Sequence, residues 1–308
     1  DALPIFSLSG SKLSAGFGDI AQRISQQNRN DRVSLDFMAN AELGKFVHAR
    51  HGISIPIYFS FSKQLSTPEY DPFQGDILLK NTLASISENS KDSLLSIVQD
   101  LTQRKSFSIL NARKVWKSSQ AIRPWNMENL SVSYLYNEQR HRDLYTAHSF
   151  LKNYRASLDY TFNNPSVTFK EPFKKPIWKT LNYNLMPSLL HFRMEINRVY
   201  SENTFRDNAN NNVLPTYYSK NFNTNRIYGI SWDLTRNLRL DFNASNYAII
   251  EEPNGRINGA RKDTLWNNFW RLGRNMDYNH MLNLTYTLPL NKLPYLEWMQ
   301  VTTRYGSQ

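Results

Sequence analysis

The chain has 308 residues, enough for one large domain or two ordinary ones, and no cysteine, which excludes disulfide staples, thiolate catalysis and cysteine metal sites. No apolar run approaches the ~20 residues of a membrane helix, yet a mean hydropathy of −0.58 allows a membrane β-barrel, because only half of its strand residues face lipid. The net charge of +11 points to anionic lipid or a polyanionic envelope rather than nucleic acid, since the basic residues are dispersed.

The first firm strand is predicted over residues 33–46, after a weaker strand near residues 3–8. Apolar side chains recur at every second position from Val33 to Leu43, and mostly polar side chains lie between them. A period of two is typical of a strand with one apolar and one polar face. The run has the length of a tilted strand that crosses a bilayer, roughly 9–11 residues.

A second strand follows over residues 53–62, where Pro56 predicts a bulge or a locally unpaired position, because proline has no amide hydrogen to donate. Residues 66–104 are predicted to be a long loop with a helix near residues 91–104. Ser90 is the expected cap of this helix, and its apolar stripe consists of Leu94, Ile97, Val98 and Leu101. We expect the helix to close the loop over its own apolar side rather than to bind a partner.

Alternation returns further along the chain and brings the predicted total to about ten strands, the later ones near residues 107–109, 130–136, 154–162, 190–197, 228–235, 238–245 and 282–288 and from 298. Connections after odd-numbered strands are mostly short: 47–52, 236–237 and 290–296. Connections after even-numbered strands are mostly long: 66–104, 201–225 and 249–279. The link 163–188 is the exception. Bacterial barrels have short periplasmic turns and long outer loops.

The pattern therefore predicts an all-β fold, an antiparallel transmembrane β-barrel, with residues 1–308 as one barrel segment. A soluble β-sandwich also alternates and stays as the alternative. Mid-strand charges of both signs on the polar faces favour a wet lumen. Because the sequence starts at Asp1 and stops at Gln308 within an apparent strand, we expect an internal fragment of a longer protein.

The two faces give two sets of candidate residues. The lumen-lining candidates are the polar or charged members: Asp36, Glu42, Arg155, Asp159, Arg193, Glu195, Asp233, Arg239 and Asp241. The lipid-facing candidates are the apolar members: Val33, Leu35, Phe37, Ile55, Ile57, Leu158, Phe192 and Leu240. Aromatic residues near strand ends predict interfacial belts: Tyr136, Tyr160, Phe162, Tyr200, Trp232, Tyr286 and Trp298.

No motif predicts catalysis, so the protein is not expected to be an enzyme. His141-Arg142-Asp143-Leu144 is similar to a kinase catalytic loop, but His148 stands where that loop has asparagine, and the glycine-rich loop and Asp-Phe-Gly are missing. His48 and His51 lack a cysteine or acid at ligand spacing. We expect no cofactor and no metal.

Several motifs in combination resemble the SprA/Sov family. They include Arg123-Pro124-Trp125-Asn126-Met127-Glu128-Asn129-Leu130, followed by Asn137-Glu138 and His141-Arg142-Asp143. Further matching stretches are Leu43-Gly44-Lys45-Phe46, Gly52-Ile53-Ser54-Ile55-Pro56, Ser66 to Pro72, Trp232 to Leu238, Glu252-Pro253-Asn254-Gly255, Gly273-Arg274-Asn275 and Leu288 to Pro294. The resemblance covers nearly the whole chain from about residue 15 onward, and the motifs are weak singly.

This family is the giant outer-membrane translocon of the Bacteroidetes type IX secretion system, also named for gliding motility. The resemblance implies that the chain is a sector of about ten strands in a much larger barrel, which passes folded proteins across the outer membrane. It implies secreted cargo proteins, a plug protein, a PorV-like partner barrel and outer-membrane lipid as partners, and no catalytic residues. Nucleic acid is not expected to bind.

Two alternatives remain open. One is a smaller, self-closed porin or receptor barrel, whose sheet would curve sharply and join its last strand to its first. The other is a soluble basic β-sandwich that binds nucleic acid or glycan, in which a second layer of the same chain would cover Leu35, Leu158, Phe192 and Leu240.

Overall fold

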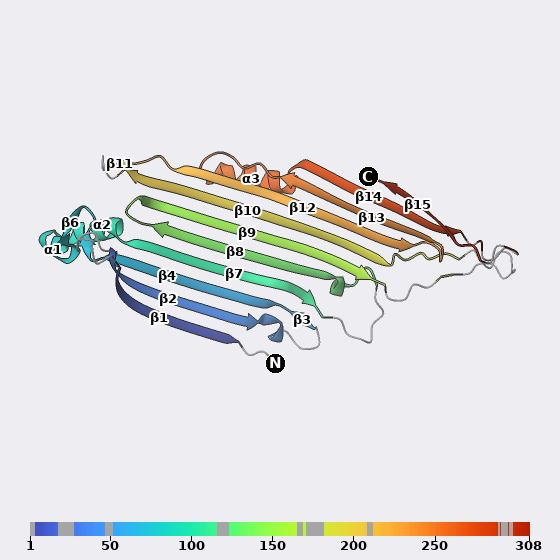
Figure 1. Ribbon diagram of the computed structural model, residues 1–308, viewed down its shortest axis with the longest axis horizontal. Helices are drawn as coiled ribbons and strands as arrows, with labels where there is room; N and C mark the ends of the chain where they lie inside the picture. The colour runs from blue at the N-terminus through green and yellow to red at the C-terminus, as the bar shows by residue number, and fades with distance from the viewer. Residues whose placement is uncertain are drawn as a thin grey trace.

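The alternating segments form one large antiparallel sheet (Figure 1). The computed structural model describes residues 4–17, 28–46, 52–115, 123–164, 169–170, 182–207, 212–288, 290, 295 and 298–308. The main sheet follows chain order as β1-β2-β4-β7-β8-β9-β10-β12-β13-β14-β15. Of the short strands, β3 pairs with β7, β11 pairs with β10, and β5 and β6 form a separate two-stranded sheet. Every strand pairing that involves a named strand is antiparallel, as the sequence predicts.

The strands of the main path are long. Their bounds are β1 Ile5–Phe17, β2 Asn28–Glu42, β4 Pro56–Pro68, β7 Asp100–Lys114, β8 Leu130–Arg142, β9 Thr146–Asn163, β10 Leu189–Asp207, β12 Tyr217–Asp233, β13 Leu238–Ile249, β14 Arg274–Leu288 and β15 Val301–Ser307. The short strands are β3 Ile53–Ser54, β5 Tyr70–Asp71, β6 Gln74–Leu78 and β11 Asn212–Val213. Since β10 has 19 residues, against a usual five or six, these strands exceed the ordinary globular length.

Three α-helices and two 3-10 turns lie outside the sheet in the described chain. They are α1 Leu79–Ser85, α2 Glu88–Val98, α3 Ala260–Trp270, η2 Leu43–Lys45 and η4 Met127–Asn129. Helices α1 and α2 lie with β6 and β11 at one end of the sheet, at the left of Figure 1. We call this the helical end and the opposite one the turn end.

The expected helix near residues 91–104 is shifted. Helix α2 begins at Glu88 after Ser87 and ends at Val98, so Ser90 lies inside it. Residues from Asp100 onward, Leu101 included, belong to strand β7. The reason is tertiary, because the register aligns Leu101 with Leu65 of β4, and ladder pairing takes these residues from the helical stripe.

Two of the three expected long loops contract because the strands run further than their alternating cores indicate. Strand β4 reaches Pro68 and β7 starts at Asp100, and β10 and β12 leave only residues 208–216 where 201–225 was expected. The third, 249–279, becomes 250–273 and contains α3, which the sequence analysis missed. The connections 47–52, 163–188 and 290–296 lie largely outside the described residues.

The irregularity expected at Pro56 is confirmed. Strand β3 ends at Ser54 and β4 starts at Pro56, so the ladder breaks at Ile55. The partner strand β7 has a register shift between Ile109 and Ala112, where Asn111 has a positive φ of 55°. An extra residue in αL conformation is a β-bulge, and asparagine tolerates that conformation better than most residues.

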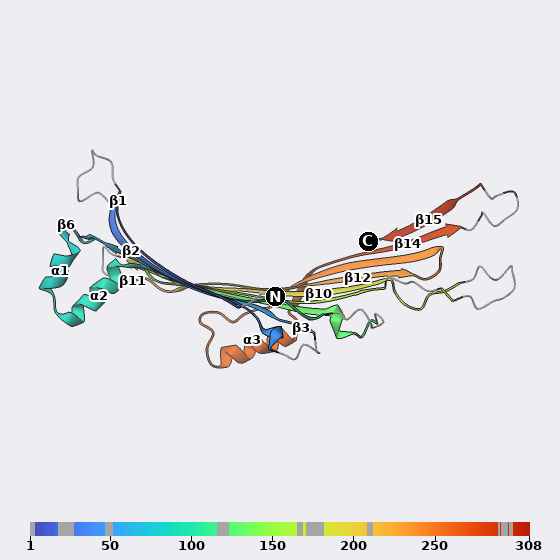
Figure 2. The same cartoon turned by 90° about the horizontal axis from the view of Figure 1, so that it is seen from below.

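The sheet is a single curved layer that does not close on itself within the described residues. Strands β1 and β15 form its two edges, and each pairs with one neighbour only. Both edges curve toward the side opposite α3 (Figure 2), which makes the α3 side convex. Buried apolar packing is correspondingly small: Phe222, Ile250 and Leu265 form the hydrophobic cluster found in the described part of the chain.

Gly44 lies too close to the backbone of Ile53 to be replaced by a larger residue without loss of stability. A Cβ built on Gly44 would lie 2.0 Å from the carbonyl oxygen of Ile53, a backbone atom that cannot swing away. We expect Gly44→Ala to destabilise the β2–β4 connection by about 1–3 kcal/mol, as overpacking does. Hydrogen exchange at the Leu43 amide, which donates to Ile55 O over 2.9 Å, measures the effect.

Gly75→Ala is the matched control, because nothing lies within 4 Å of its added Cβ. Equal exchange at Leu43 in both variants and the parent protein would contradict the close approach.

Candidate functional site

The register gives the sheet two chemically distinct faces. Residues that pair directly across an antiparallel ladder share a face, and successive residues alternate. Ile196 and Phe222 lie on the face that packs against α3, which is the convex face. The residues between them in each strand lie on the concave face. The register carries this assignment from each strand to its neighbour.

The concave face is polar along the strands, and all nine lumen-lining candidates have its parity. Arg193 bridges two of the acids: its guanidinium lies 3.2 Å from Asp159 and 2.5 Å from Glu195. Ser157 donates a further hydrogen bond to Asp159 over 3.0 Å. The structure thus gathers these candidates into one cluster whose charges largely compensate.

The remaining concave candidates are spread along the sheet. Arg239 forms an ion pair with Asp241 over 3.0 Å and lies opposite Asp233 in the register. Arg155 donates to the side chain of Asn197 over 2.8 Å. Asp36 is flanked by serines on both neighbouring strands. These residues are distributed over the concave face and form no single centre among the described residues.

Glu42 has the parity of the concave face but serves the turn end of β2. Its carboxylate accepts the backbone amides of Ile55 over 2.5 Å and of Gly44 over 3.2 Å. Pro56, opposite Glu42 in the register, has no amide to donate. The carboxylate therefore satisfies the backbone where the ladder breaks, next to the lipid-facing candidate Ile55.

The convex face carries an apolar band, which we define as the stretch from the turn end to the first charged or strongly polar residue of each strand. The other seven lipid-facing candidates lie in it, half-buried or exposed: Val33, Leu35, Phe37, Ile57, Leu158, Phe192 and Leu240. In the described chain no second sheet covers these residues. A sandwich core is therefore not what shields them.

Aromatic side chains border the band at both ends. Tyr160, Phe162, Trp232 and Tyr286 lie toward the turn end, and Tyr136 and Tyr200 toward the helical end, all with convex parity. The indole of Trp232 donates to Asn184 O over 3.0 Å. Trp298 lies outside the strands and is exposed. Six of the seven aromatic residues thus share the convex face, where Phe162 and Tyr200 are buried, and their role as interfacial belts stays a prediction.

The helical-end boundary of the band runs obliquely across the strands. Its last apolar or aromatic members are Phe61 in β4, Tyr136 in β8, Ile196 in β10, Tyr228 in β12 and Leu282 in β14. Through the register, Phe61 is level with Tyr200 of β10. Leu282, in contrast, is level with Leu190 of the same strand.

This displacement defines a tilt. It amounts to about ten residues, or ~33 Å along the strand, over about seven strand spacings of ~4.8 Å each. The boundary therefore makes an angle of roughly 45° with the perpendicular to the strands. If the boundary is level, the strands are inclined by that angle, which agrees with the 35–45° tilt of transmembrane barrels.

Beyond the boundary, the loop 250–273 is clamped onto the convex face. Arg198 binds Glu252 with two charge-assisted hydrogen bonds of 2.6 and 2.9 Å, and both side chains are largely buried. Lys220 donates to the carbonyls of Pro253, over 2.6 Å, and of Gly255. Bidentate pairs of this kind fix orientation as well as charge.

Aromatic rings surround Arg198 of this clamp, by which we mean the contacts of Arg198 and Lys220 with the loop 250–273. The guanidinium of Arg198 lies 5.5–5.8 Å from the ring centroids of Tyr154, Tyr200 and Phe222. Phe222 also stacks on Phe269 of α3 at 6.1 Å. Cations held over ring faces gain electrostatic attraction, which is larger when they are desolvated.

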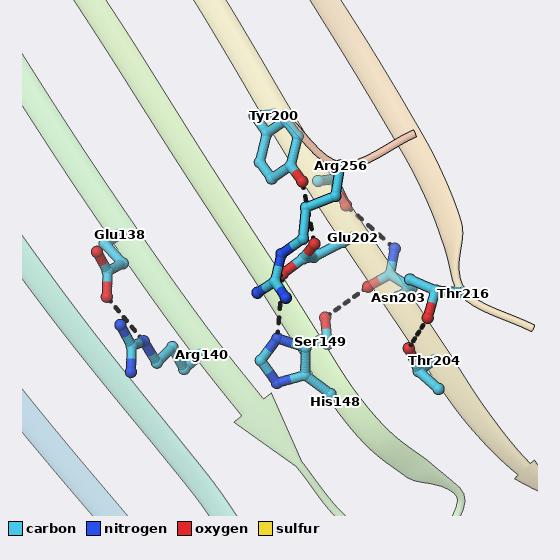
Figure 3. A network of polar contacts seen from close by, with 11 residues as sticks. Glu138, Arg140, His148, Ser149, Tyr200, Glu202, Asn203, Thr204, Thr216 and Arg256 are labelled. Atoms are coloured by element: carbon cyan, nitrogen blue, oxygen red, sulfur yellow. Dashed lines mark hydrogen bonds and ion pairs between the residues drawn. The ribbon is translucent and has the colours of Figure 1, made fainter. Parts of the chain in front are cut away.

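A polar network continues from this clamp toward the helical end (Figure 3). Glu202, buried on β10, accepts from Tyr200 over 3.0 Å and lies 3.5 Å from His148 and 3.4 Å from Arg256. On β8, buried Glu138 pairs with Arg140 over 2.8 Å. Both acids are therefore enclosed by the groups that neutralise them.

Sequence reasoning missed this clamp, although part of its signal is visible. Leu265 and Phe269 are four residues apart between Gly259 and Gly273, which is the spacing of one helix face bounded by glycines. The partners Arg198 and Glu252 are 54 residues apart in sequence, and no local pattern connects them.

Neither helices nor acidic clusters suggest another kind of site. No helix in the described ranges is long and apolar enough to cross a membrane. Among the residues that the structure describes, no three histidine, aspartate or glutamate side chains gather as a metal site requires.

The fold defines the class: an all-antiparallel, single-layer open β-sheet with one polar and one apolar face. Residues 3–83, which contain β1 to β6 and most of α1, match the SprA_N family, described as a motility related/secretion protein. This match supports, for the N-terminal part of the chain, the SprA/Sov assignment made from the sequence. No curated protein sequence matches the chain.

The buried Arg198–Glu252 ion pair is expected to stabilise the loop 250–273 on the sheet. Arg198→Ala leaves the carboxylate of Glu252, 3% exposed, without its partner, and breaking a buried pair costs about 3–5 kcal/mol. We expect residues 250–273 to lose hydrogen-exchange protection. Arg239→Ala, which removes the exposed Arg239–Asp241 pair, should cost only about 0–1 kcal/mol. Similar losses in both variants would contradict the clamp.

The stability of the β8–β9 turn is expected to depend on pH through the carboxyl group of Asp143. Partial burial tends to raise the pKa of Asp143, but hydrogen bonds from Thr146, His141 and Tyr145 outweigh it and lower that pKa below its usual value. A depressed carboxyl pKa stabilises the turn above the unfolded pKa, ~3.9, and this stability is lost as the pH falls through the folded value.

We expect the amides of Tyr145 and Thr146 to lose protection as the pH falls below the unfolded pKa of about 3.9 and through the lower folded pKa of Asp143. Asp143→Asn should show low protection already at pH 6, whereas Asp76→Asn, an exposed position in β6, should follow the parent protein. Unchanged protection in Asp143→Asn would refute this role.

Proposed function

We propose that this chain is a sector of the wall of an outer-membrane protein-conducting channel, the translocon of a type IX secretion system, which passes folded proteins and supports gliding motility. The family match gives the coarser role, motility and secretion. The observation that carries the finer proposal is the oblique boundary of the apolar band, because a boundary at roughly 45° to the strand perpendicular is what a level bilayer surface imposes on tilted strands.

The open sheet favours a wide pore over a small one. Eleven strands on the main path leave β1 and β15 at opposite edges, whereas a ten-strand porin or receptor barrel would join them. Barrel diameter grows with strand number, and folded cargo needs a large lumen. Unpaired edges of this length are also an aggregation risk unless further strands continue the ladder.

The concave face suits passage of protein. Its acids and cations are mostly paired with each other, as in the Arg193 cluster and the Arg239–Asp241 pair. Such a wall stays wet while offering few unpaired charges to retain cargo. Secreted cargo is the proposed occupant of this side, with a plug protein and a PorV-like partner barrel as the gating partners, because a wide pore without closure would leak.

A soluble sandwich that binds nucleic acid or glycan is disfavoured by the convex face. Its apolar band continues across many strands, whereas soluble monomers rarely expose large contiguous apolar patches, and in the described chain no second sheet covers it. Lipid tails are the cover that the band fits, since they are as apolar as the band itself.

Cysteine scanning tests the proposal directly, because the chain has no native cysteine. In the full-length protein in its membrane, Ser157→Cys and Asn243→Cys should react with a charged maleimide. Leu158→Cys and Leu240→Cys, on the same strands but the other face, should react more slowly by on the order of tenfold or more, because a charged reagent does not enter hydrocarbon.

Spin labels at the two apolar positions should collide with lipid-soluble oxygen more often than with a water-soluble nickel chelate. Equal reactivity of both faces, or preferential contact of Leu158 and Leu240 with water, would overturn the membrane assignment.

A further inference from the structure

Helix α3 lies at a special level of the convex face. Its buried side chain Leu265 packs with Phe222 and Ile250, and partly buried Ile196 and Phe269 border this cluster. Ile196 is the last member of the apolar band on β10, and Arg198 follows it on the same face. The helix, on the convex side of the sheet (Figure 2), therefore borders the end of the apolar band at Ile196 of β10, and on β12 it packs on Phe222, beyond the band's last member Tyr228.

The helix turns two tryptophans to solvent. Trp266 is 55% exposed and Trp270 75% exposed, and both pack edge-on against Phe269, at 5.5 and 5.3 Å between ring centroids. Apart from these edge contacts with Phe269, both indoles are largely open to solvent. Tryptophan is the residue that concentrates where hydrocarbon meets polar headgroups.

The surrounding charges have a consistent order, with acids inside and cations outside. Glu202 is 5% exposed and its partner Arg256 68%; Glu138 is 8% exposed and its partner Arg140 53%. Each acid contacts only part of the guanidinium group of its arginine, and more than half of that arginine side chain is exposed. Arg142, on the same face, has a buried Nε without a hydrogen-bond partner among the described residues.

These features together have the chemistry of a lipid headgroup site. Guanidinium groups match phosphate oxygens in geometry and charge, and cations near an anionic membrane surface each contribute about 1 kcal/mol. The apolar band continues below the tryptophans, so one ligand can place acyl chains on the band and its phosphate among the arginines.

We propose that α3 with its loop 250–273, together with Arg140 and Arg256, is an interfacial anchor that binds the phosphate-bearing headgroups of anionic lipids. This inference rests on the proposed function, since it takes the convex face to be the lipid side. The lipid layer, rather than a partner protein, is the occupant, because the helix borders the end of the apolar band at Ile196 and carries two exposed tryptophans, and exposed guanidinium groups lie on the same face.

The first test measures depth. A fluorophore on Trp266→Cys in the full-length protein, reconstituted in nanodiscs of phosphatidylglycerol and phosphatidylcholine, should be quenched by a spin label on the lipid headgroup more strongly than by one at the acyl end. The matched control is Trp125→Cys, also exposed but near the turn end of β8. Absence of quenching by either lipid at position 266 overturns the anchor and indicates water or a protein partner.

The second test measures charge. Each of Arg140→Gln and Arg256→Gln should lower the preference for phosphatidylglycerol over phosphatidylcholine roughly fivefold, the equivalent of about 1 kcal/mol per cation. Arg239→Gln, similarly exposed at 55% but on the concave face, should leave the preference unchanged. An unchanged preference in both convex variants refutes phosphate recognition.

Two readouts keep the outcomes apart. Hydrogen exchange over residues 250–273 shows whether Arg256→Gln has detached the loop; where it has, Arg140→Gln, which lies on β8 outside the loop, decides. Lipid contact at Leu158 and Leu240 without quenching at position 266 sinks this inference alone. Loss of lipid contact at all three positions sinks the channel proposal as well.

Discussion

The structure depends on one constraint: an antiparallel ladder keeps residues of equal parity on one face across eleven consecutive strands. A shift of one residue at any strand would exchange its faces. In the band the two faces stay separate, since the bulge of β7 takes up the register shift between Ile109 and Ala112. Leu158 of β9 and Met194 of β10 thus meet on the convex side, while Asp159 and Arg193 meet on the concave side. Apolar and polar media can then be kept apart by a wall one chain thick.

The same constraint explains why so little of the chain is buried. A single layer has no interior, and its stability comes from the ladder, from cross-strand pairs and from whatever medium covers the apolar band. The irregular places are handled locally. Glu42 supplies the acceptor where Pro56 interrupts pairing, and Asn111 takes up the extra residue of the β7 bulge. The Glu42 carboxylate thereby satisfies the amides of Ile55 and Gly44 without a second layer.

The loop with α3 adds a second level of organisation on the convex face. Arg198 is the pivot of this region, because it binds Glu252 and lies over three aromatic rings that come from different strands. Buried acids and outward cations then give the helical end a positive outer rim above an apolar band. The proposed channel wall and the proposed lipid anchor both use the convex face, at different levels along the strands.

By itself the sequence determined the long strands, their two faces and the break near Pro56, because period-two alternation and proline chemistry are local properties. It placed all nine polar candidates on one face without any contact information. Only the tertiary structure decided where strands end, since ladder pairing carried β10 and β12 past their alternating cores and took Leu101 from the helix. The clamp of Arg198 on Glu252 and the slope of the apolar boundary were also beyond sequence, because both arise from register between distant strands.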